Sequence, residues 1–254
     1  MKNYLPAVAL WLGLIGCQPA AEKGTSSHPA QRIINQAITA HGGEALSSAH
    51  ISFNFRKKHY EAVLDQGQFT YQSTGTDSTG AQVHDVLTNE GFTRTVNGQS
   101  VTLNSEDQQR FGNSLNSVVY FVLLPYPLND PAVSATYLEE ASVRGEPYHK
   151  IRVTFSQAGG GDDFDDEYIY WIHQDQHTVD YLAYSFEVNG GGTRFREAYN
   201  TRVVNGIRFD DYINYESTVD NFALADYDQL FEAGQVKELS RIDTENIEVK
   251  KPDA

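Results

Sequence analysis

Residues 104–131 read NSEDQQRFGNSLNSVVYFVLLPYPLNDP, and this stretch predicts the longest helix of the chain. Ser105 stands at the N-cap position, and Gln108 follows three residues later, which is the spacing of a capping box. Apolar residues then recur at helical intervals until Pro125, where the helix ends because proline has no amide donor. The last two turns, residues 118–124, are apolar on nearly every side, so the helix needs cover from most directions.

The composition limits the class of protein. The chain has 254 residues, of which 40% are hydrophobic and 12% aromatic, and its formal net charge is −15. Aromatic enrichment favours sheet, because aromatic side chains fit a pleated, half-buried surface. A protein that binds nucleic acid needs a basic surface, so the acidity excludes that class. Cys17 is the single cysteine, which excludes an intrachain disulfide and a cysteine-rich metal centre.

Most of the remaining chain alternates between apolar and polar residues and predicts antiparallel strands. Asn97-Gly98 and Asn205-Gly206 separate two pairs of such runs and predict tight hairpins. A shorter helix is expected to begin near Pro29 and to end at His41. The predicted fold is α+β and mainly antiparallel β, with residues 29–250 in one domain. We expect a single strongly curved sheet, an incomplete barrel, wrapped around one or two helices.

The N-terminus has the pattern of an export signal. Lys2 precedes a short apolar run, residues 5–15, which is too short to span a bilayer. The run ends in Leu14-Ile15-Gly16-Cys17, which resembles the lipobox of bacterial lipoproteins. The resemblance implies that residues 1–16 are a signal peptide cut before Cys17, that Cys17 carries the acyl chains, and that residues 17–28 form a flexible tether. Gln18 after the cysteine resembles an outer-membrane address, so we expect a cell-envelope protein that meets the membrane through its lipid.

Two resemblances bear on the domain. The signal, the lipobox, the early helix, the long meander and the inserted helix resemble the LolA/LolB-like and LppX-like lipoprotein carriers, in which a sheet covers helices and an apolar cavity. More closely, the segments 159–166 (GGGDDFDD), 180–184 (DYLAY) and 189–192 (NGGG) look like an uncharacterised family of bacterial lipoproteins. That family implies no established activity.

The apolar end of the long helix is the predicted ligand site. It has more apolar faces than one sheet covers, and an uncovered apolar surface marks a ligand groove or a contact site. Acyl chains suit such a groove, because a buried methylene contributes about 0.8 kcal/mol without polar partners. The predicted helix-side residues are Val119, Leu123, Tyr126 and Leu128, and the predicted strand-side residues are Trp171, Tyr184, Arg194 and Arg196. The alternatives are a dry core for the apolar set and an outward-facing charge ladder, on the face opposite Phe195, for the arginines.

The segment 159–167 predicts a second kind of site. Asp162, Asp163, Asp165 and Asp166 lie close together after three glycines. Crowded carboxylates repel one another, and Ca²⁺ relieves that repulsion because it takes many oxygen ligands from flexible loops. The alternative is a solvated hairpin loop. No other cofactor is expected.

Three functions follow from these patterns. The first is a lipid-anchored protein that binds or carries a hydrophobic ligand between sheet and helix. The second is a hydrolase, a lyase or a calcium-dependent protein that acts through the segment 159–167. The third is a structural lipoprotein without a ligand. The sequence contains no common hydrolase, zinc-protease or nucleotide-binding motif, so whether it is an enzyme stays open.

Overall fold

The predicted long helix is present as α2 (Ser105–Val122). In a computed structural model that describes residues 29–156, 166–186 and 190–250, the N-cap is Asn104, one residue earlier than predicted. The Asn104 side chain accepts a hydrogen bond from the Asp107 amide at 2.8 Å. Asn104 has an extended backbone and an oxygen acceptor, which are the two requirements of an N-cap. Gln108 lies in the first turn, where its side chain donates to the carbonyl of Leu103.

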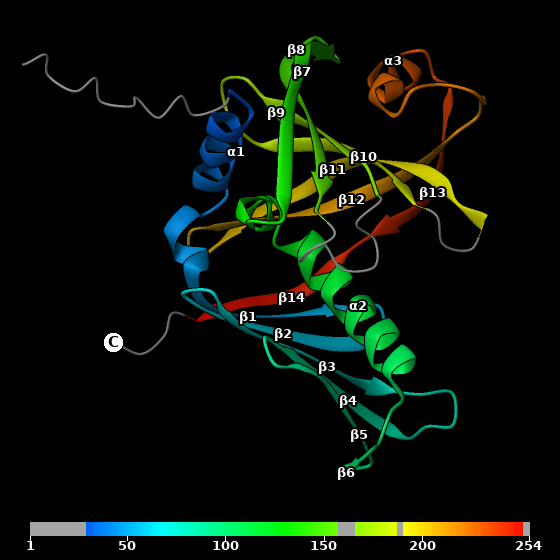
Figure 1. Cartoon of the computed structure of the whole chain (residues 1–254). Coiled ribbons are helices and arrows are strands. Elements are labelled where there is room, and N and C mark those ends of the chain that lie inside the picture. The colour runs from blue at the N-terminus through cyan, green and yellow to red at the C-terminus, as the bar shows by residue number, and fades with distance from the viewer. Residues whose placement is uncertain (1–28, 157–165, 187–189, 251–254) are drawn as a thin grey trace, which may run out of the picture.

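Helices and strands account for most of the described chain (Figure 1). The helices are α1 (Pro29–Ala40), α2 and α3 (Tyr227–Glu232), and the short 3-10 turns are η1 (Gly43–Ser47), η2 (Tyr126–Asn129) and η4 (Leu224–Asp226). The strands before α2 are β1 (Ser48–Phe55), β2 (Lys58–Asp65), β3 (Gln68–Thr76), β4 (Gln82–Thr88), β5 (Gly91–Val96) and β6 (Gln99–Ser100). The strands after it are β7 (Val133–Val143), β8 (Glu146–Phe155), β9 (Tyr168–His173), β10 (Val179–Phe186), β11 (Gly192–Val204), β12 (Ile207–Ser217), β13 (Val236–Ile242) and β14 (Thr244–Lys250).

The strands form two antiparallel sheets, which corrects the prediction of one strongly curved sheet. Sheet A has seven strands in the order β14-β1-β2-β3-β4-β5-β6, and sheet B has seven in the order β13-β12-β11-β10-β9-β8-β7. The last extended segment of the chain is divided at Asp243 into β13 and β14. β13 pairs with β12 in sheet B, whereas β14 pairs with β1 in sheet A. One extended segment therefore belongs to both sheets (Figure 1).

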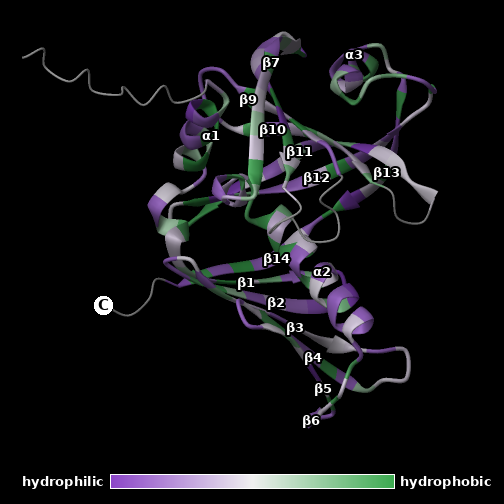
Figure 2. Cartoon of the chain, viewed as in Figure 1, coloured by the Kyte–Doolittle hydropathy of each residue, from purple (hydrophilic) through white to green (hydrophobic). Residues whose placement is uncertain are grey.

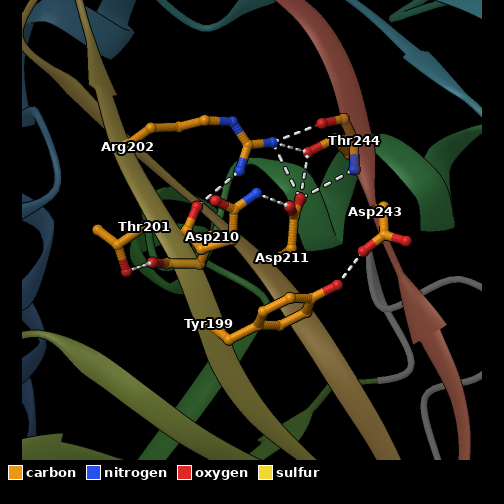
Figure 3. Close-up of polar contacts among 8 residues, drawn as sticks. Tyr199, Thr201, Arg202, Asp210, Asp211, Asp243 and Thr244 are labelled. Atoms are coloured by element: carbon orange, nitrogen blue, oxygen red, sulfur yellow. Dashed lines mark hydrogen bonds and ion pairs between the residues drawn. The ribbon is translucent and has the colours of Figure 1, made fainter.

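Where the chain passes from sheet B to sheet A, side chains make the hydrogen bonds that strand pairing makes elsewhere. The carboxylate of Asp211 accepts hydrogen bonds from the backbone amide and the hydroxyl of Thr244, both at 2.9 Å. The Arg202 guanidinium donates to the carbonyl of Thr244 at 2.6 Å and to the same Asp211 carboxylate at 2.9 Å (Figure 3). These contacts satisfy backbone groups that no neighbouring strand reaches, so the sheet divides here without leaving them unpaired.

Helix α2 lies between the two sheets, as its apolar last turns require. Leu115, Val119 and the C-cap residue Leu123 are buried in a core with β1 and β2 of sheet A. On another side of the helix, Tyr120 and Phe121 pack against the core of sheet B. Figure 2 shows hydrophilic and hydrophobic residues mixed along α2. The helix is therefore covered on two sides by sheet and open along the rest of its surface.

Helix α1 covers part of the same face of sheet B. Its buried residues Ala30, Ile33, Ile34 and Ala37 belong to the core that contains β8, β9 and β10 residues. His41 follows the helix and is 1% exposed. Its Nε2 atom accepts a hydrogen bond from the amide of Val179 at 3.1 Å, and its carbonyl accepts one from the amide of Arg208 at 3.0 Å. His41 thus joins the end of α1 to two strands of sheet B.

The opposite face of sheet B is covered by α3, which the sequence did not predict. Tyr227 and Phe195 stack there with their ring centroids 5.4 Å apart. Lys150 is fully buried beneath this layer, and its Nζ atom lies 3.1 Å from Asp228 and 2.9 Å from Glu139. Helix α3 has six residues, which is too short for a helical period to be recognised in the sequence.

Both asparagine–glycine turns are confirmed. Asn97 and Gly98 have φ values of 49° and 77°, and Asn205 and Gly206 have φ values of 49° and 86°. Two successive positive φ angles define a type I′ turn, which asparagine and glycine adopt most easily. These turns join β5 to β6 and β11 to β12. None of the helices in the described ranges is both long and apolar enough to cross a bilayer.

Candidate functional site

An open groove of about 830 Å³ runs between α2 and sheet A. Its floor includes Phe69 and Tyr71 of β3, whose ring centroids lie 4.5 Å apart. Its helix side includes Gly112, where the missing side chain brings the backbone close to Phe92 and Leu87. The other apolar and aromatic residues of the lining are Leu64, Tyr120, Phe121, Tyr126, Pro127, Ala132, Phe155 and Tyr168.

The groove carries little charge. Asp130 is the one charged side chain in its lining among the described residues. Burial raises the pKa of the Tyr71 hydroxyl to about 12, and nearby Tyr126 and Asp130 add to this shift. Burial likewise raises the pKa of Tyr120 to about 12, although its hydrogen bond with Tyr170 acts in the opposite direction. Tyr71 and Tyr120 are therefore neutral at physiological pH, and with one charged side chain in the described lining the groove suits a hydrophobic ligand.

A second cavity of about 490 Å³ lies on the other side of α2, where the two sheets meet. Phe55 and Arg56 from the end of β1, together with Thr244 from β14, line the cavity from sheet A. Tyr184, Arg194 and Arg196 line it from sheet B, and Ser114, Ser117, Val118 and Val122 line it from α2. The remaining lining residues are Phe121, Asp166, Tyr168, Phe186, Asp210, Tyr212 and Ile242.

The groove and this second cavity share part of their lining. Ser117 and Phe121 of α2 and Tyr168 of β9 border both spaces. The rings of Phe121 and Tyr168 lie 6.4 Å apart, and Tyr168 stacks on Tyr184 at 5.5 Å. An aromatic border thus separates a mainly apolar space from a more polar one.

Arg196 is the most buried cation of the second cavity, with 8% of its surface exposed. Its Nη2 atom donates to the hydroxyl of Tyr184 at 2.9 Å, and its guanidinium lies 4.0 Å from the centroid of the Phe121 ring. Its Nε atom is buried and has no hydrogen-bond partner within the described ranges. Aromatic faces stabilise a guanidinium by cation–π attraction, but they leave its in-plane donors free.

Asp210 adds a carboxylate to the wall of this cavity, and that carboxylate is already paired. It lies 3.0 Å from Nε of Arg208 and accepts a hydrogen bond from the Thr201 hydroxyl at 2.5 Å (Figure 3). Burial raises the pKa of Asp210, while Arg208 and Thr201 act in the opposite direction. Asp210 therefore offers little charge to a ligand.

The predicted ligand residues fall into two groups. Tyr126 lines the groove, and Tyr184, Arg194 and Arg196 line the second cavity. Val119, Leu123, Leu128 and Trp171 are each at most 2% exposed and line neither space. Val119 and Leu123 are buried because sheet A covers their side of α2, and Trp171 lies in the core beneath α3. A ligand contact through these four side chains stays a prediction.

The structure reverses the faces that were expected for β11. The alternation of side chains along β11 correctly places Phe195 on one face of the strand and Arg194 and Arg196 on the other. Phe195, however, packs in the core beneath α3, whereas the two arginines point into the cavity beside α2. The outward-facing charge ladder is therefore wrong for Arg194 and Arg196. The reason is that both faces of sheet B are covered, and parity alone does not say which helix covers which face.

The predicted calcium ligands are mostly outside the described residues. Asp162, Asp163 and Asp165 lie there, whereas Asp166 is described, buried and part of the lining of the second cavity. Within the ranges that the structure describes, no group of three or more His, Cys, Asp or Glu side chains is placed to hold a metal. The calcium site stays a prediction about a segment that the structure does not describe.

Several lining residues were missed by the sequence reasoning. Tyr168 and Phe121 border both spaces, and Phe69 and Tyr71 form the floor of the groove. Phe69 and Tyr71 are two residues apart on β3, which was a sign of a shared apolar face. Nothing in the local sequence indicated that Phe121 and Tyr168 meet, because the contact joins residues far apart in the chain.

The chain matches several solved structures over most of its length. A LolA superfamily protein, NE2245, from Nitrosomonas europaea matches with a TM-score of 0.50 and 10% identity, over 88% of this chain and 94% of that one. A putative outer membrane lipoprotein-sorting protein domain from Vibrio parahaemolyticus matches with a TM-score of 0.47 and 6% identity, over 89% and 94%. Lipoprotein LppX from Mycobacterium tuberculosis matches with a TM-score of 0.29 and 14% identity, over 64% and 88%.

The match to NE2245 confirms the predicted LolA-like architecture, and at this identity it is a likeness of fold alone. Comparison with curated proteins gives no match. The predicted membership in an uncharacterised family is confirmed as well: the chain belongs to the family of unknown function DUF6503, whose model matches residues 22–244.

Proposed function

We propose that this protein is a lipid-anchored protein of the cell envelope that binds or carries a hydrophobic, acyl-chain-like ligand between sheet A and α2. Cys17 is the proposed acylation site, and the outer membrane is the proposed location. Both proposals rest on the sequence Leu14-Ile15-Gly16-Cys17 and on Gln18. The LolA-like fold supports an envelope carrier at the level of architecture.

The groove of about 830 Å³ is the observation that carries the proposal. Its lining is rich in aromatic and aliphatic side chains, and its position between a helix and a sheet is one that ligand sites often occupy. A chain of methylene groups needs no polar partner there, so each buried methylene contributes its full transfer free energy.

Binding of palmitate and hexadecanol to the purified protein tests the proposal. Each is measured by displacement of a fluorescent fatty acid. We expect the wild type to bind both, and we expect Asn116→Trp to weaken binding about tenfold, because a ring added at this exposed position of α2 fills the groove. Thr136→Trp is the matched control, since Thr136 is exposed on β7 and lines neither space.

The two variants separate ligand loss from loss of fold. Thr136→Trp should bind both compounds like the wild type, and both variants should keep the wild-type circular dichroism spectrum. The proposed function would be overturned if the wild type bound neither palmitate nor hexadecanol.

A further inference from the structure

The second cavity has a charge that differs from the rest of the protein. The chain has a formal net charge of −15, yet three of the five charged side chains that line this cavity are arginines. They are Arg56, Arg194 and Arg196, and the two acidic residues are Asp166 and Asp210. Arg208 pairs with Asp210 from outside the lining. Three cations against two carboxylates give the described lining a formal charge of +1 in an acidic protein, which favours anions over cations there.

Arg196 is a buried guanidinium with a donor that no described protein group accepts. Its one hydrogen bond to another side chain, across the described part of the chain, goes to the neutral hydroxyl of Tyr184. Its Nε donor is buried without a partner there. No ion pair joins Arg194 or Arg196 to a carboxylate within the described ranges. Burying a charge without an opposite charge is costly, so a site of this kind gains free energy when an anion enters it.

Arg194 lies two residues from Arg196 on the same face of β11. Its Nη1 atom donates to the carbonyl of Thr193 at 2.7 Å, and its guanidinium lies 5.0 Å from the centroid of the Phe186 ring. The hydroxyls of Ser114 and Ser117 line the cavity from α2 on the other side. Two guanidinium groups and two hydroxyls are the donors that a carboxylate or a phosphate requires.

The second cavity and the apolar groove adjoin at the aromatic border. Ser117, Phe121 and Tyr168 line both spaces, so a molecule with a polar head and an apolar tail has a suitable surface for each part. Building on the proposed function, we propose that the ligand is an anionic amphiphile. Its carboxylate or phosphate head binds Arg196 and Arg194, and its acyl tail passes Phe121 into the groove.

Probes that share one tail and differ in the head test this assignment. They are palmitate, hexadecyl phosphate, neutral hexadecanol and cationic hexadecyltrimethylammonium, each measured by displacement of a fluorescent fatty acid. We expect the wild type to bind palmitate or hexadecyl phosphate about ten- to hundredfold more tightly than hexadecanol, which is the range that one charge-assisted hydrogen bond contributes. The cationic probe should bind most weakly.

Substitutions at the arginines separate the head site from the groove. Arg196→Met keeps an unbranched stem but lacks the guanidinium, so it should remove the preference for anionic probes while leaving hexadecanol binding within about twofold of the wild type. Arg194→Gln, at a less buried position, should also remove the preference for anionic probes. This second variant keeps the test informative if Arg196→Met does not fold. Arg110→Met is the matched control, because Arg110 is exposed on α2 and lines neither space.

The outcomes distinguish this inference from the proposed function. If the wild type bound hexadecanol as tightly as both anionic probes, the proposed head site would be wrong, whereas the proposed acyl-chain groove would be unaffected. The head site would also be wrong if Arg196→Met and Arg194→Gln both kept the wild-type preference for anionic probes. Absence of binding by all four probes would overturn the proposed function itself. Inorganic phosphate that binds more tightly than hexadecyl phosphate would indicate a site for free anions instead of an amphiphile.

Discussion

Asp211 and Thr244 meet where the chain passes from one sheet to the other, and the Asp211 carboxylate binds both the amide and the hydroxyl of Thr244 at 2.9 Å. Thr244 is the first residue of β14, and Asp243 separates it from β13. Because β14 pairs with β1, the Asp211 side chain occupies the place that a β12 backbone group would otherwise take. Figure 3 shows Arg202 completing this contact from β11. The same junction forms one wall of the cationic cavity, since Asp210 and Thr244 line it.

We expect Asp211→Ala to lower the free energy of unfolding by about 2–4 kcal/mol, because it removes the carboxylate that pairs with the half-buried Arg202 and leaves the buried Thr244 amide without its acceptor. Urea unfolding measures the loss. Asp220→Ala, the same change at an exposed position, should alter stability by at most about 0.5 kcal/mol. Equal effects of the two substitutions would show that the junction does not depend on Asp211.

The stability of the fold should decrease in acid through His41. Burial lowers the pKa of His41 to about 3, and the positive charge of Arg208 contributes to this shift. The unfolded chain therefore takes up a proton below about pH 6.5 while the folded state does not, so stability is present above that pH and is lost as the pH falls toward 3. The loss amounts to about 1.4 kcal/mol per pH unit in this window.

Urea unfolding of the wild type and of His41→Gln from pH 7.5 to pH 5 isolates this contribution. Glutamine offers an oxygen acceptor to the Val179 amide and does not titrate. The wild type should lose about 2 kcal/mol more than the variant over this range. If the free energy of unfolding fell equally with pH in the wild type and in His41→Gln, His41 would take up its proton in the folded state as readily as in the unfolded chain.

Leu123→Ala should cost about 2–5 kcal/mol of stability, because Leu123 is 2% exposed in the core between α2 and sheet A. The cost should appear in urea unfolding with no ligand present. Leu239→Ala is the matched control, since Leu239 is 38% exposed on β13, and its cost should stay below about 1 kcal/mol. A small cost at Leu123 would place this side chain at the edge of the groove instead of in the core.

The buried pair of Lys150 and Asp228 predicts an asymmetric mutational response. Asp228→Asn should destabilise the protein by about 3–5 kcal/mol, because it leaves the buried Lys150 with one partner, Glu139, whose side chain is 60% exposed. The double variant Lys150→Met/Asp228→Leu removes both charges and should recover most of the loss. Thermal unfolding of the single and double variants measures both effects. If the double variant is no more stable than Asp228→Asn, the unpaired charge is not the cause.

If Cys17 is acylated as proposed, Cys17→Ser should move the protein from the membrane fraction to the soluble periplasmic fraction, because serine has no thiol to carry the acyl chains. Fractionation followed by immunoblotting measures the change. Ser26→Cys in the Cys17→Ser background should not restore membrane association, since the lipobox is missing at that position. Continued membrane association of Cys17→Ser would contradict the proposed anchor.

The sequence by itself determined most of the helices and strands of this protein and which side chains share a face within a strand. Its helical period located α2, its asparagine–glycine pairs located two hairpins, and its alternation of residues located most of the strands. The period of two also separated Phe195 from Arg194 and Arg196. All of these signals are local, because they depend on residues within one turn or one strand of each other.

The tertiary structure decided where the strands separate into two sheets and which side chains surround the cavities. The division at Asp243 depends on Asp211 and Arg202, which lie more than thirty residues earlier in the chain. The orientation of Arg196 toward Phe121 depends on α2 covering one face of sheet B and α3 covering the other. The physical reason is the same in each case: the free energy that selects these arrangements comes from contacts between distant segments, which no local pattern encodes.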